Sequence, residues 1–600
     1  MANPNARDGK PGRAARRSGR WLSAAGRGRV GDVRTRSAIL LSAFLSLLLG
    51  VLFAVPLWLV LRGGFWVDGR PTLRPVLAVF RNAVYLQGLR NSLFIALGTT
   101  FCSACIAVPL AWIGDQFDFA GKRLLSALVL LPMILPPFVG AIGFQQIFGA
   151  YGVLNALLGL GPVDWLGGGQ FCGVVLLQSL ALYPILYLNA SAALANIDPA
   201  CEEAAANLGA GRATRLFRIV LPLAAPGLFA GGTLIFIWSF TELGTPLIMN
   251  FTRCAPVQIY DALRDVGKSP FPYALTSVVL FSSVSLYALS RLLFARGHLA
   301  VAPKAAVAKA PRPLRGLAAA AAALPYALVV FCALLPHLGV IFTSFSVPGS
   351  WYGTVLPAAW TGSNWLEALA HPLTISSIKN SVLFAACAVV ADTALGLGIA
   401  FVVVRSRLRF RGFLDALSML PLAVPGLVMA FGFIAVSSWL ANQKAFAGVP
   451  WWAQLVDVRT NPTLFLVIAY AVRRMPYMVR SAVAGLEQTS ETYEEAAHNL
   501  GAGAATTLRR VTFPLITANL IAGGLLTFAF SMLEVSDSLM LAQQADYMPI
   551  TKAVYELFQL LGSGPYVASA LGVWAMAFLA TTLVGASLLL GKKMGALFRL

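Results

Sequence analysis

The sequence predicts an all-α polytopic membrane protein, with about 12 transmembrane helices in two parallel six-helix repeats. Hydrophobic residues make up 58% of the 600 residues and charged residues only 12%, which favours a membrane protein over several soluble domains. The net charge of +21 would also suit a nucleic-acid partner. However, the basic residues gather at the ends of apolar stretches, as the positive-inside rule predicts. A polar segment that recurs in both halves indicates the internal repeat.

Residues 1–37 are predicted to form a disordered, basic cytoplasmic tail that can contact anionic lipid. Residues 1–36 hold ten Lys or Arg residues against Asp8 and Asp32. The same composition would suit the charged start of a signal peptide. The apolar stretch that follows is too long for a signal peptide and lacks a clear cleavage site, so we expect it to be the first span.

Each half is expected to contain six spans of about 20 residues, the length that crosses a bilayer. The first repeat covers 38–297, a cytoplasmic linker covers 298–316, and the second repeat covers 317–595. With the tail inside, the arginine-rich segments of both halves and both chain termini are cytoplasmic. The expected spans are about 39–62, 91–114, 124–148, 170–193, 224–248 and 271–295, then 317–344, 380–404, 413–439, 461–483, 516–540 and 565–590.

Prolines are expected to kink the third span of each half. Proline removes a backbone donor, and neighbouring helices in a membrane satisfy the groups that it frees. Such kinks are also compatible with a gate. The prolines concerned are Pro132, Pro136 and Pro137 in the first half, and Pro421 and Pro425 in the second.

Two pieces of sequence recur at a fixed spacing. Residues 202–222 align without a gap with residues 494–514 at an offset of 292, and most of the 21 positions are identical. Arg90-Asn91-Ser92-Leu93 pairs with Lys379-Asn380-Ser381-Val382 at an offset of 289. The second half therefore gained three residues, 292 minus 289, before its polar segment. An even number of spans in each half makes the two repeats parallel.

The recurring polar segment is predicted to form a helix, a turn and a second helix outside the bilayer. Glu203, Ala204 and Ala205 favour a helix, and Gly209 supplies the permissive backbone that the turn needs. The alternative is an amphipathic cytoplasmic linker that was duplicated with its domain. The candidate site residues of the two copies are Glu202, Glu203, Ala204, Ala205, Gly209, Glu494, Glu495, Ala496, Ala497 and Gly501.

The spacing Glu-Ala-Ala, three residues, Gly, nine residues, an aliphatic residue, one residue, a hydrophobic residue and Pro resembles the EAA loop of binding-protein-dependent ABC importer permeases. The first copy continues with Ile219 and Leu221-Pro222, and the second with Val511 and Phe513-Pro514, with Phe in place of Leu. The resemblance implies the type I ABC importer permease fold over about residues 38–595. It also implies that loops 195–222 and 487–514 are coupling loops that dock into grooves on a separate ATPase.

The resemblance further implies a membrane subunit that is not itself an enzyme. Gly267-Lys268-Ser269 does not complete a nucleotide-binding loop, because Ala262 stands where the first glycine is required. We expect no cofactor in this chain, with ATP and magnesium bound by a homodimeric ATP-binding cassette partner. The other expected partners are a periplasmic substrate-binding protein and the lipid bilayer, not nucleic acid. The expected location is the bacterial inner membrane.

Ionisable residues inside spans are costly and point to function. Glu242 and Glu534 are separated by 292 residues, the offset of the polar segments, and Asp537 lies beside the second. We expect these acids to line a translocation path and to suit a cationic or metal cargo, because hard cations take oxygen ligands. The alternative is a pair of structural carboxylates bonded to neighbouring hydroxyl groups. The sequence does not identify a set of metal ligands.

Within the importers, a fused chain with two EAA loops resembles the ferric-iron transport permeases, with thiamine and aminoethylphosphonate permeases as relatives. Iron(III) is therefore the expected cargo, and thiamine, a polyamine or aminoethylphosphonate is the alternative. A different class is the major-facilitator-type secondary transporter, which also has two parallel halves. Asp118-Phe119-Ala120-Gly121-Lys122-Arg123 is similar to its Asp-x-x-Gly-Arg-Arg loop. That class leaves the two EAA loops unexplained.

Overall fold

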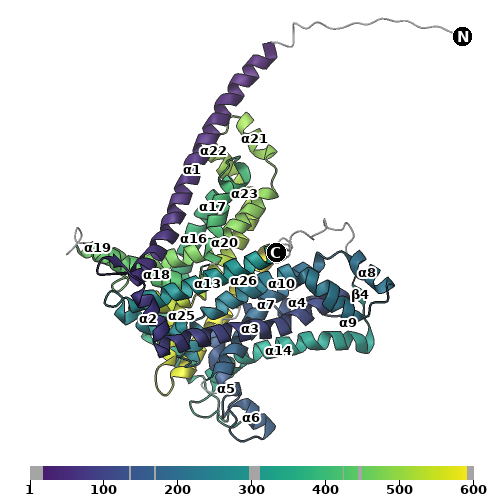
Figure 1. Cartoon of the computed structure of the whole chain (residues 1–600), viewed down its shortest axis with the longest axis vertical. Coiled ribbons are helices and arrows are strands. Elements are labelled where there is room, and N and C mark those ends of the chain that lie inside the picture. The colour runs from purple at the N-terminus through teal and green to yellow at the C-terminus, as the bar shows by residue number, and fades with distance from the viewer. Residues whose placement is uncertain are drawn as a thin grey trace, which may run out of the picture.

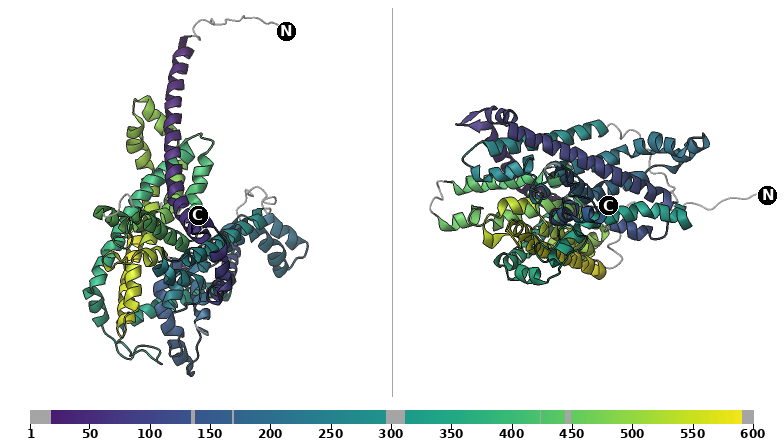
Figure 2. Two further views of the ribbon diagram at one scale, coloured as in Figure 1. Left: turned by 60° about the vertical axis from the view of Figure 1, so that its left-hand side comes forward. Right: turned by 90° about the horizontal axis from the view of Figure 1, so that it is seen from below.

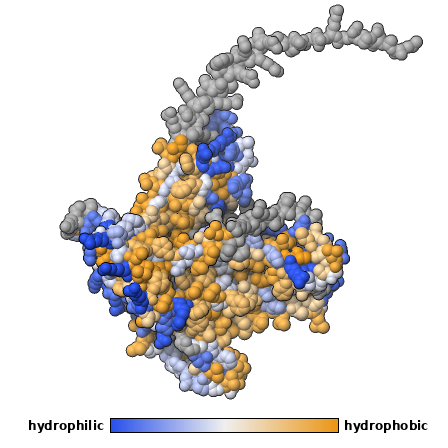
Figure 3. Space-filling model, viewed as in Figure 1, coloured by the Kyte–Doolittle hydropathy of each residue, from blue (hydrophilic) through white to orange (hydrophobic). Residues whose placement is uncertain are grey.

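The computed structural model describes residues 18–133, 137–167, 170–295, 311–422, 424–443 and 449–590, and these ranges are mostly helical (Figure 1). Within them, ten helices are long and apolar enough to cross a membrane. A bent pair, Arg411–Leu422 with Gly426–Ala441, raises the number to eleven. Apolar side chains cover broad areas of the surface, and hydrophilic ones gather at its extremities (Figure 3). This distribution suits a body surrounded by lipid.

The first half is a run of helices with one short hairpin. Its elements are α1 (Ser18–Phe65), β1 (Trp66–Val67), β2 (Arg70–Pro71), α2 (Arg74–Arg81), α3 (Ala83–Gln116), β3 (Phe117–Asp118), α4 (Lys122–Leu128), η1 (Leu131–Met133), α5 (Pro137–Phe148), α6 (Val153–Leu158), α7 (Phe171–Ala195), α8 (Pro199–Asn207), α9 (Arg212–Arg215), η2 (Leu216–Val220), α10 (Leu221–Phe240), α11 (Gly244–Ile248), α12 (Ala255–Asp261), η3 (Ala262–Asp265) and α13 (Phe271–Ala295).

The second half begins with a strand that pairs in parallel with β3. Its elements are β4 (Arg312–Pro313), α14 (Gly316–Phe345), α15 (Ser363–Ala370), α16 (Pro372–Arg405), α17 (Arg411–Met419), η5 (Leu420–Leu422), α18 (Gly426–Ala441), α19 (Pro450–Val456), α20 (Thr463–Glu487), α21 (Thr492–Asn499), α22 (Ala504–Thr507), η7 (Leu508–Thr512), α23 (Phe513–Met532), α24 (Ser536–Leu541), η8 (Ala545–Tyr547), α25 (Ile550–Phe558) and α26 (Gly564–Leu590).

The boundaries of equivalent helices repeat with the offsets found in the sequence. Both ends of α2 and α15, and both ends of α3 and α16, are 289 residues apart. Both ends of α7 and α20, and both ends of α10 and α23, are 292 residues apart. The three extra residues therefore lie between the start of α18 and the start of α20. The two halves are folded copies of one plan.

Helix α20 accounts for the difference between eleven apolar spans and the expected number of about 12. It has the same length as its counterpart α7, 25 residues. It is not among the apolar spans, because Arg473, Arg474 and Arg480 interrupt it. Most of the helix is otherwise buried among other helices. Arg473 and Arg474 are largely enclosed by protein, whereas the side chain of Arg480 is 51% exposed and pairs with Asp415.

The first helix of each half packs against a helix of the other half. Helix α1 packs along α18, and α14 packs along α5. Both crossings use a glycine: a Cβ on Gly432 would lie 2.8 Å from Pro56 Cβ, and a Cβ on Gly143 would lie 2.0 Å from the carbonyl oxygen of Pro336. Gly143 and Gly432 are again 289 residues apart. Small residues allow such close approach of membrane helices, so the exchange interlocks the halves.

The third span of each half is broken rather than smoothly kinked. In the second half, the segments before and after Pro425 meet at 99°. In the first half, η1 ends at Met133 and α5 begins at Pro137, while Pro136 lies outside the described residues. Proline cannot donate the hydrogen bond that would continue a helix, which explains why both breaks fall at these prolines.

Two predicted segments are only partly described. Helix α1 begins at Ser18, inside the predicted tail 1–37, and residues 1–17 lie outside the described residues. Of the predicted linker 298–316, residues 298–310 lie outside them as well. The rest of the linker includes β4, which joins the start of the second half to the end of α3 through its pairing with β3.

Candidate functional site

The first recurring polar segment folds as predicted into a helix, a turn and a second helix. Asp198 caps α8, because its Oδ1 accepts a hydrogen bond from the amide of Ala200 at 2.9 Å. Gly209 follows the helix with a φ of 82°, a conformation that strains most other residues. The π-helical turn η2 then leads into α10. The loop is thus held at both ends by backbone geometry that its sequence specifies.

The second copy has the same architecture and lies at a separate tip of the molecule (Figures 1 and 2). Gly501 has a φ of 85°, and η7 leads into α23. Leu208 and Leu500 stand immediately before the two glycines, and each is 89% exposed. The same apolar side chain is therefore exposed at the same place on both tips. These leucines were not among the residues predicted from the sequence, although both copies contain Asn-Leu-Gly.

Within each loop the two adjacent glutamates point in opposite directions. Glu203 and Glu495 are exposed, and so are available to a partner. Glu202 is half-buried, and Glu494 is only 4% exposed. The candidate residues predicted from the sequence therefore divide into an outward-facing part and an inward-facing part, which the sequence could not separate.

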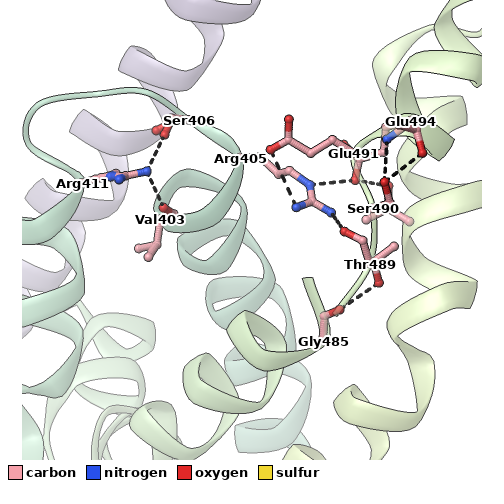
Figure 4. A network of polar contacts seen from close by, with 11 residues as sticks. Val403, Arg405, Ser406, Arg411, Gly485, Thr489, Ser490, Glu491 and Glu494 are labelled. Carbon is pink, nitrogen blue, oxygen red and sulfur yellow. Dashed lines mark hydrogen bonds and ion pairs between the residues drawn. The ribbon is translucent and has the colours of Figure 1, made fainter. Parts of the chain in front are cut away.

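Glu494 ties the second loop to the end of α16 (Figure 4). Arg405, the last residue of α16, places its Nε 3.2 Å from Glu494 Oε1 and donates from Nη2 to the carbonyl oxygen of Thr489 at 2.8 Å. Thr512 Oγ1 donates to the same carboxylate oxygen at 3.2 Å. In this way one buried carboxylate links α16, α21 and the π-helical turn. The second loop is thereby bonded to the end of a long transmembrane helix.

The first half builds the same tie with a neutral donor. Gln116, the last residue of α3, donates from Nε2 to Glu202 Oε2 at 3.1 Å. Gln116 and Arg405 are 289 residues apart, so they occupy equivalent positions. The sequence analysis missed both residues, because each lies far along the chain from the loop that it holds.

A basic residue also caps the C-terminal end of the equivalent helix in each half, α3 in the first and α16 in the second. Lys122 Nζ donates to the carbonyl oxygens of Gly114 and Phe117 at 2.6 and 2.7 Å. The equivalent Arg411 donates from Nη1 to the carbonyl oxygens of Val403 and Ser406 at 3.5 and 3.2 Å. Cations stabilise the C-terminal end of a helix. Lys122 belongs to the segment that is similar to a major-facilitator loop, and it therefore has a structural role at the end of α3.

The recurring Asn-Ser pair of the sequence sets the position of α12 and α25. Ser92 Oγ accepts a hydrogen bond from the amide of Ala255 at 2.9 Å, and Ser381 Oγ accepts one from Ile550 at 2.7 Å. The neighbouring asparagines bind carbonyl oxygens just before the same helices, at Arg253 in the first half and Met548 in the second. Both helices are therefore anchored to the start of the second span of their own half.

The acids Glu534 and Asp537 lie after α23, and both are buried. Arg473 Nη1, on α20, is 2.8 Å from Glu534 Oε1 and 3.5 Å from Asp537 Oδ2. Arg474 pairs with the other oxygen of Glu534, and its guanidinium lies over the ring of Phe530. Buried charges are tolerated when they are paired. The two arginines therefore allow two carboxylates at this depth.

Glu242 occupies the equivalent place in the first half, and its Oε1 accepts a hydrogen bond from the amide of Thr245 at 3.4 Å. Arg473 lies in electrostatic range of Glu242 as well as of Glu534. Nearby, a Cβ on Gly244 would lie 2.6 Å from Val535 Cγ1. The acids of the two halves thus meet at the boundary between the halves. Their part in translocation stays a prediction.

Arg473 and Arg474 are the most important residues that the sequence analysis missed. The signal was a pair of adjacent arginines in a helix that is otherwise largely apolar, an expensive arrangement in a membrane. Their guanidinium groups pair with the carboxylates of Glu534 and Asp537, two of the three acids that were expected to suit a metal. Within the described ranges, no group of three or more His, Cys, Asp or Glu residues is placed to hold a metal ion.

Comparison with known proteins agrees with the repeated plan. Residues 107–296 and 393–587 both match the family described as binding-protein-dependent transport system inner membrane component. The chain is 27% identical over 477 residues to the ferric transport system permease protein FbpB of Actinobacillus pleuropneumoniae, covering 77% of this chain and 64% of that protein's length.

Two relatives from Haemophilus influenzae extend this comparison. The Fe(3+)-transport system permease protein FbpB 2 is 24% identical over 473 residues, covering 78% of this chain and 83% of that protein. The molybdenum transport system permease protein ModB is 31% identical over 190 residues, covering 30% of this chain and 81% of that protein. The first relative matches most of the chain, and the second matches a length close to that of one half.

Proposed function

Because the chain belongs to the family of binding-protein-dependent transport system inner membrane components, we propose that its two halves enclose the pathway of an importer for ferric iron. The chain is an ABC importer permease and a multi-pass inner membrane protein. In the proposed assembly, a periplasmic binding protein delivers the cargo and a homodimeric ATPase binds ATP and magnesium. Both chain termini then lie in the cytoplasm, on the side of the ATPase.

The pair of recurring loops carries this proposal. Each loop presents an exposed glutamate and an exposed leucine next to a glycine with positive φ, at positions 292 residues apart. Two equivalent docking tips on one chain suit two equivalent grooves on a homodimeric partner. The partner contacts are assigned to Glu203, Leu208, Glu495 and Leu500. Glu202 and Glu494 do not contact the partner in this proposal. They position the loops by bonding them to α3 and α16.

The mechanism that follows is alternating access. ATP binding draws the two halves of the ATPase together, and the coupling loops move with them. Through Gln116 and Arg405, each loop movement is passed to the second span of its half. The interlocked helices α1 and α14 make each half move against a helix of the other. ATP drives transport because the nucleotide-bound ATPase binds one conformation better than the other.

Ferric iron is proposed as the cargo because two relatives that match about three quarters of the chain are named as ferric permeases. The acids Glu242, Glu534 and Asp537 support a pathway between the halves. With Glu534 and Asp537 bound by arginines, we place the capture of bare metal in the binding protein. The pathway through this chain is then not required to capture the metal itself.

An oxyanion such as molybdate is the second candidate cargo. Arg473 and Arg474 place guanidinium donors at the boundary between the halves, and guanidinium groups suit oxyanions. The half-length relative is named as a molybdenum permease. This candidate predicts that anionic cargo contacts Arg473, whose side chain is 29% exposed.

The first experiment is affinity purification of the chain from mild detergent, with intact-mass identification of bound proteins. We expect a stoichiometric ATPase that is lost from the Glu203→Lys, Glu495→Lys double variant. Asp265→Lys, an exposed acid outside both loops, is the matched control and should retain the ATPase. A chain that comes alone from membranes known to contain the ATPase would contradict the proposal. Uptake of radioactive ferric citrate and of molybdate, by cells with and without the chain, then separates the two cargoes.

A further inference from the structure

A buried lysine lies where the two halves meet beyond the ends of α10 and α23. Each of these helices is 20 residues long and therefore spans about 30 Å from the coupling loop at its start. Helices α12 and α25 follow them, so they lie toward the face opposite the coupling loops. In the proposed orientation this is the outer face, where cargo enters.

Two equivalent tyrosines face each other at this place. Tyr260 of α12 and Tyr555 of α25 are 295 residues apart, as are the first residues of the two helices. Their ring centroids are 6.3 Å apart and their planes are perpendicular, a favourable edge-to-face arrangement. The same side chain from each half is thus brought to one point, which is the geometry of a closed junction between the halves.

Lys552 fills the space beside this tyrosine pair, and its side chain is 3% exposed. Its Nζ lies 5.5 Å from the centroid of each tyrosine ring and 3.1 Å from the Tyr260 hydroxyl. Glu556 Oε1 lies 2.8 Å from the same nitrogen. An ammonium group removed from water is held by aromatic faces and by a carboxylate. Lys552 thereby joins an element of its own half to Tyr260 of the other half.

The tyrosines and acids around Lys552 are repeated in the two halves, but the lysine itself is not. Tyr260-Asp261 in the first half corresponds to Tyr555-Glu556 in the second, but the residue equivalent to Lys552 is Val257. One cation therefore serves both halves. Lys552 also adjoins Thr551, whose Oγ1 donates to the carbonyl oxygen of Glu534 at 2.7 Å. The junction is thus connected to the charged cluster one layer deeper.

We propose that Lys552 is the residue that pins the outer end of the transport pathway shut, by bridging Tyr260 and Tyr555 across the boundary between the halves. The inference rests on the proposed importer function for its direction, because it identifies the outer face as the entry for cargo. Opening requires Lys552 to leave Tyr260. Its ion pair with Glu556 travels with α25, since Glu556 lies one helical turn away on the same helix.

The test measures the distance across the junction. Spin labels are attached at Arg264→Cys and Leu561→Cys, two exposed positions just after α12 and α25, in a chain whose seven native cysteines are replaced. Pulsed dipolar spectroscopy without nucleotide should give one short distance for the parent. Lys552→Met should add a longer distance, with a population roughly tenfold above the parent, because it removes a desolvated cation from the junction. Lys552→Arg should restore the short distance.

Controls separate the possible failures. Lys268→Met removes an exposed charge after α12 and should leave the short distance unchanged. If Lys552→Met does not fold, Tyr260→Leu removes the same bridge without leaving the lysine unpaired and should also add the longer distance. An unchanged distribution in the folded variants would overturn the inference. ATPase retention is measured on the same samples. Loss of the ATPase from the parent counts against the importer and leaves the distance measurement valid.

Discussion

Arg405 Nε lies 3.2 Å from Glu494 Oε1, and these two side chains are only 7% and 5% exposed. The equivalent pair in the first half, Gln116 and Glu202, is joined at 3.1 Å by a neutral amide. The same joint between a coupling loop and a transmembrane helix is therefore ionic and buried in one half, and polar and half-buried in the other. The two loops should differ in how much they depend on it.

Glu494→Ala should lower the free energy of unfolding by about 3 kcal/mol, because it removes the buried carboxylate that pairs with Arg405 and leaves only the exposed Glu491, whose Oε1 is 4.0 Å from Arg405 Nη1. Glu202→Ala should cost only about 1 kcal/mol, since a neutral partner is left behind. Unfolding of the purified chain in mixed micelles with increasing sodium dodecyl sulfate measures both values. The exposed neighbour, Glu495→Ala, is the control and should leave the midpoint unchanged. Equal losses at Glu202 and Glu494 would contradict the distinction.

Leu208→Asp and Leu500→Asp should weaken ATPase binding without destabilising the chain. Each leucine is 89% exposed, so its replacement removes no internal packing. Full burial of a leucine in a partner groove contributes about 2 kcal/mol, and each change should therefore reduce affinity by more than about tenfold. Titration of the purified ATPase measures the affinity. Leu561→Asp, 98% exposed on another loop, should bind as the parent does; a similar loss there would show a nonspecific effect.

Gly209→Asn and Gly501→Asn should be tolerated better than Gly209→Val and Gly501→Val. Both glycines have positive φ, 82° and 85°, which asparagine adopts far more readily than a β-branched residue. Among the described residues, apart from the two chain neighbours, no heavy atom lies within 4 Å of a Cβ added at either position, so the difference arises from the backbone. We expect it to be on the order of 1 kcal/mol per site. Thermal unfolding of the four variants measures it, and equal midpoints for Asn and Val would contradict it.

Gly143→Ala should destabilise the chain more than Gly432→Ala. A Cβ at Gly143 meets the backbone carbonyl of Pro336 at 2.0 Å, whereas one at Gly432 first meets the side chain of Pro56 at 2.8 Å. Overpacking costs about 1–3 kcal/mol. The cost of Gly143→Ala should lie at the upper end of this range, because the backbone of Pro336 cannot move aside as a side chain can. Thermal unfolding in detergent tests the order. Gly50→Ala in α1 is the control and should not destabilise the chain, because a Cβ added there meets nothing within 4 Å among the described residues outside its own helical turn.

Arg473→Met should abolish cargo uptake, because it leaves Glu534 and Asp537 buried with one cation fewer. Removal of one partner from a buried ionic group costs about 3–5 kcal/mol. Adding Asp537→Asn removes one of the excess negative charges and should recover part of the folded yield. Yield and uptake are both measured, because recovery of yield without uptake assigns Arg473 to the pathway itself. Full uptake by Arg473→Met would remove the cluster from the mechanism.

Much of the fold could be predicted from the sequence. The two parallel halves and the helix–turn–helix loops followed from hydrophobic length, the placement of basic residues and an exact spacing between repeats. Kinks were expected at Pro137 and Pro425. At Pro425 the break is a sharp one of 99°, and in the first half a new helix begins at Pro137. The span at about 461–483 was expected to be an ordinary apolar helix, and the helix found there, α20, instead buries Arg473 and Arg474.

The sequence by itself determined the duplication, the membrane setting and the positions of the candidate loops, because these depend on local composition and on spacing along the chain. Only the tertiary structure decided which glutamate of each loop faces inward, which arginines neutralise Glu534, and where Tyr260 meets Tyr555. Those relationships join residues from different helices or different halves. The chain sets them by packing helices side by side, and no pattern within a single segment records that packing.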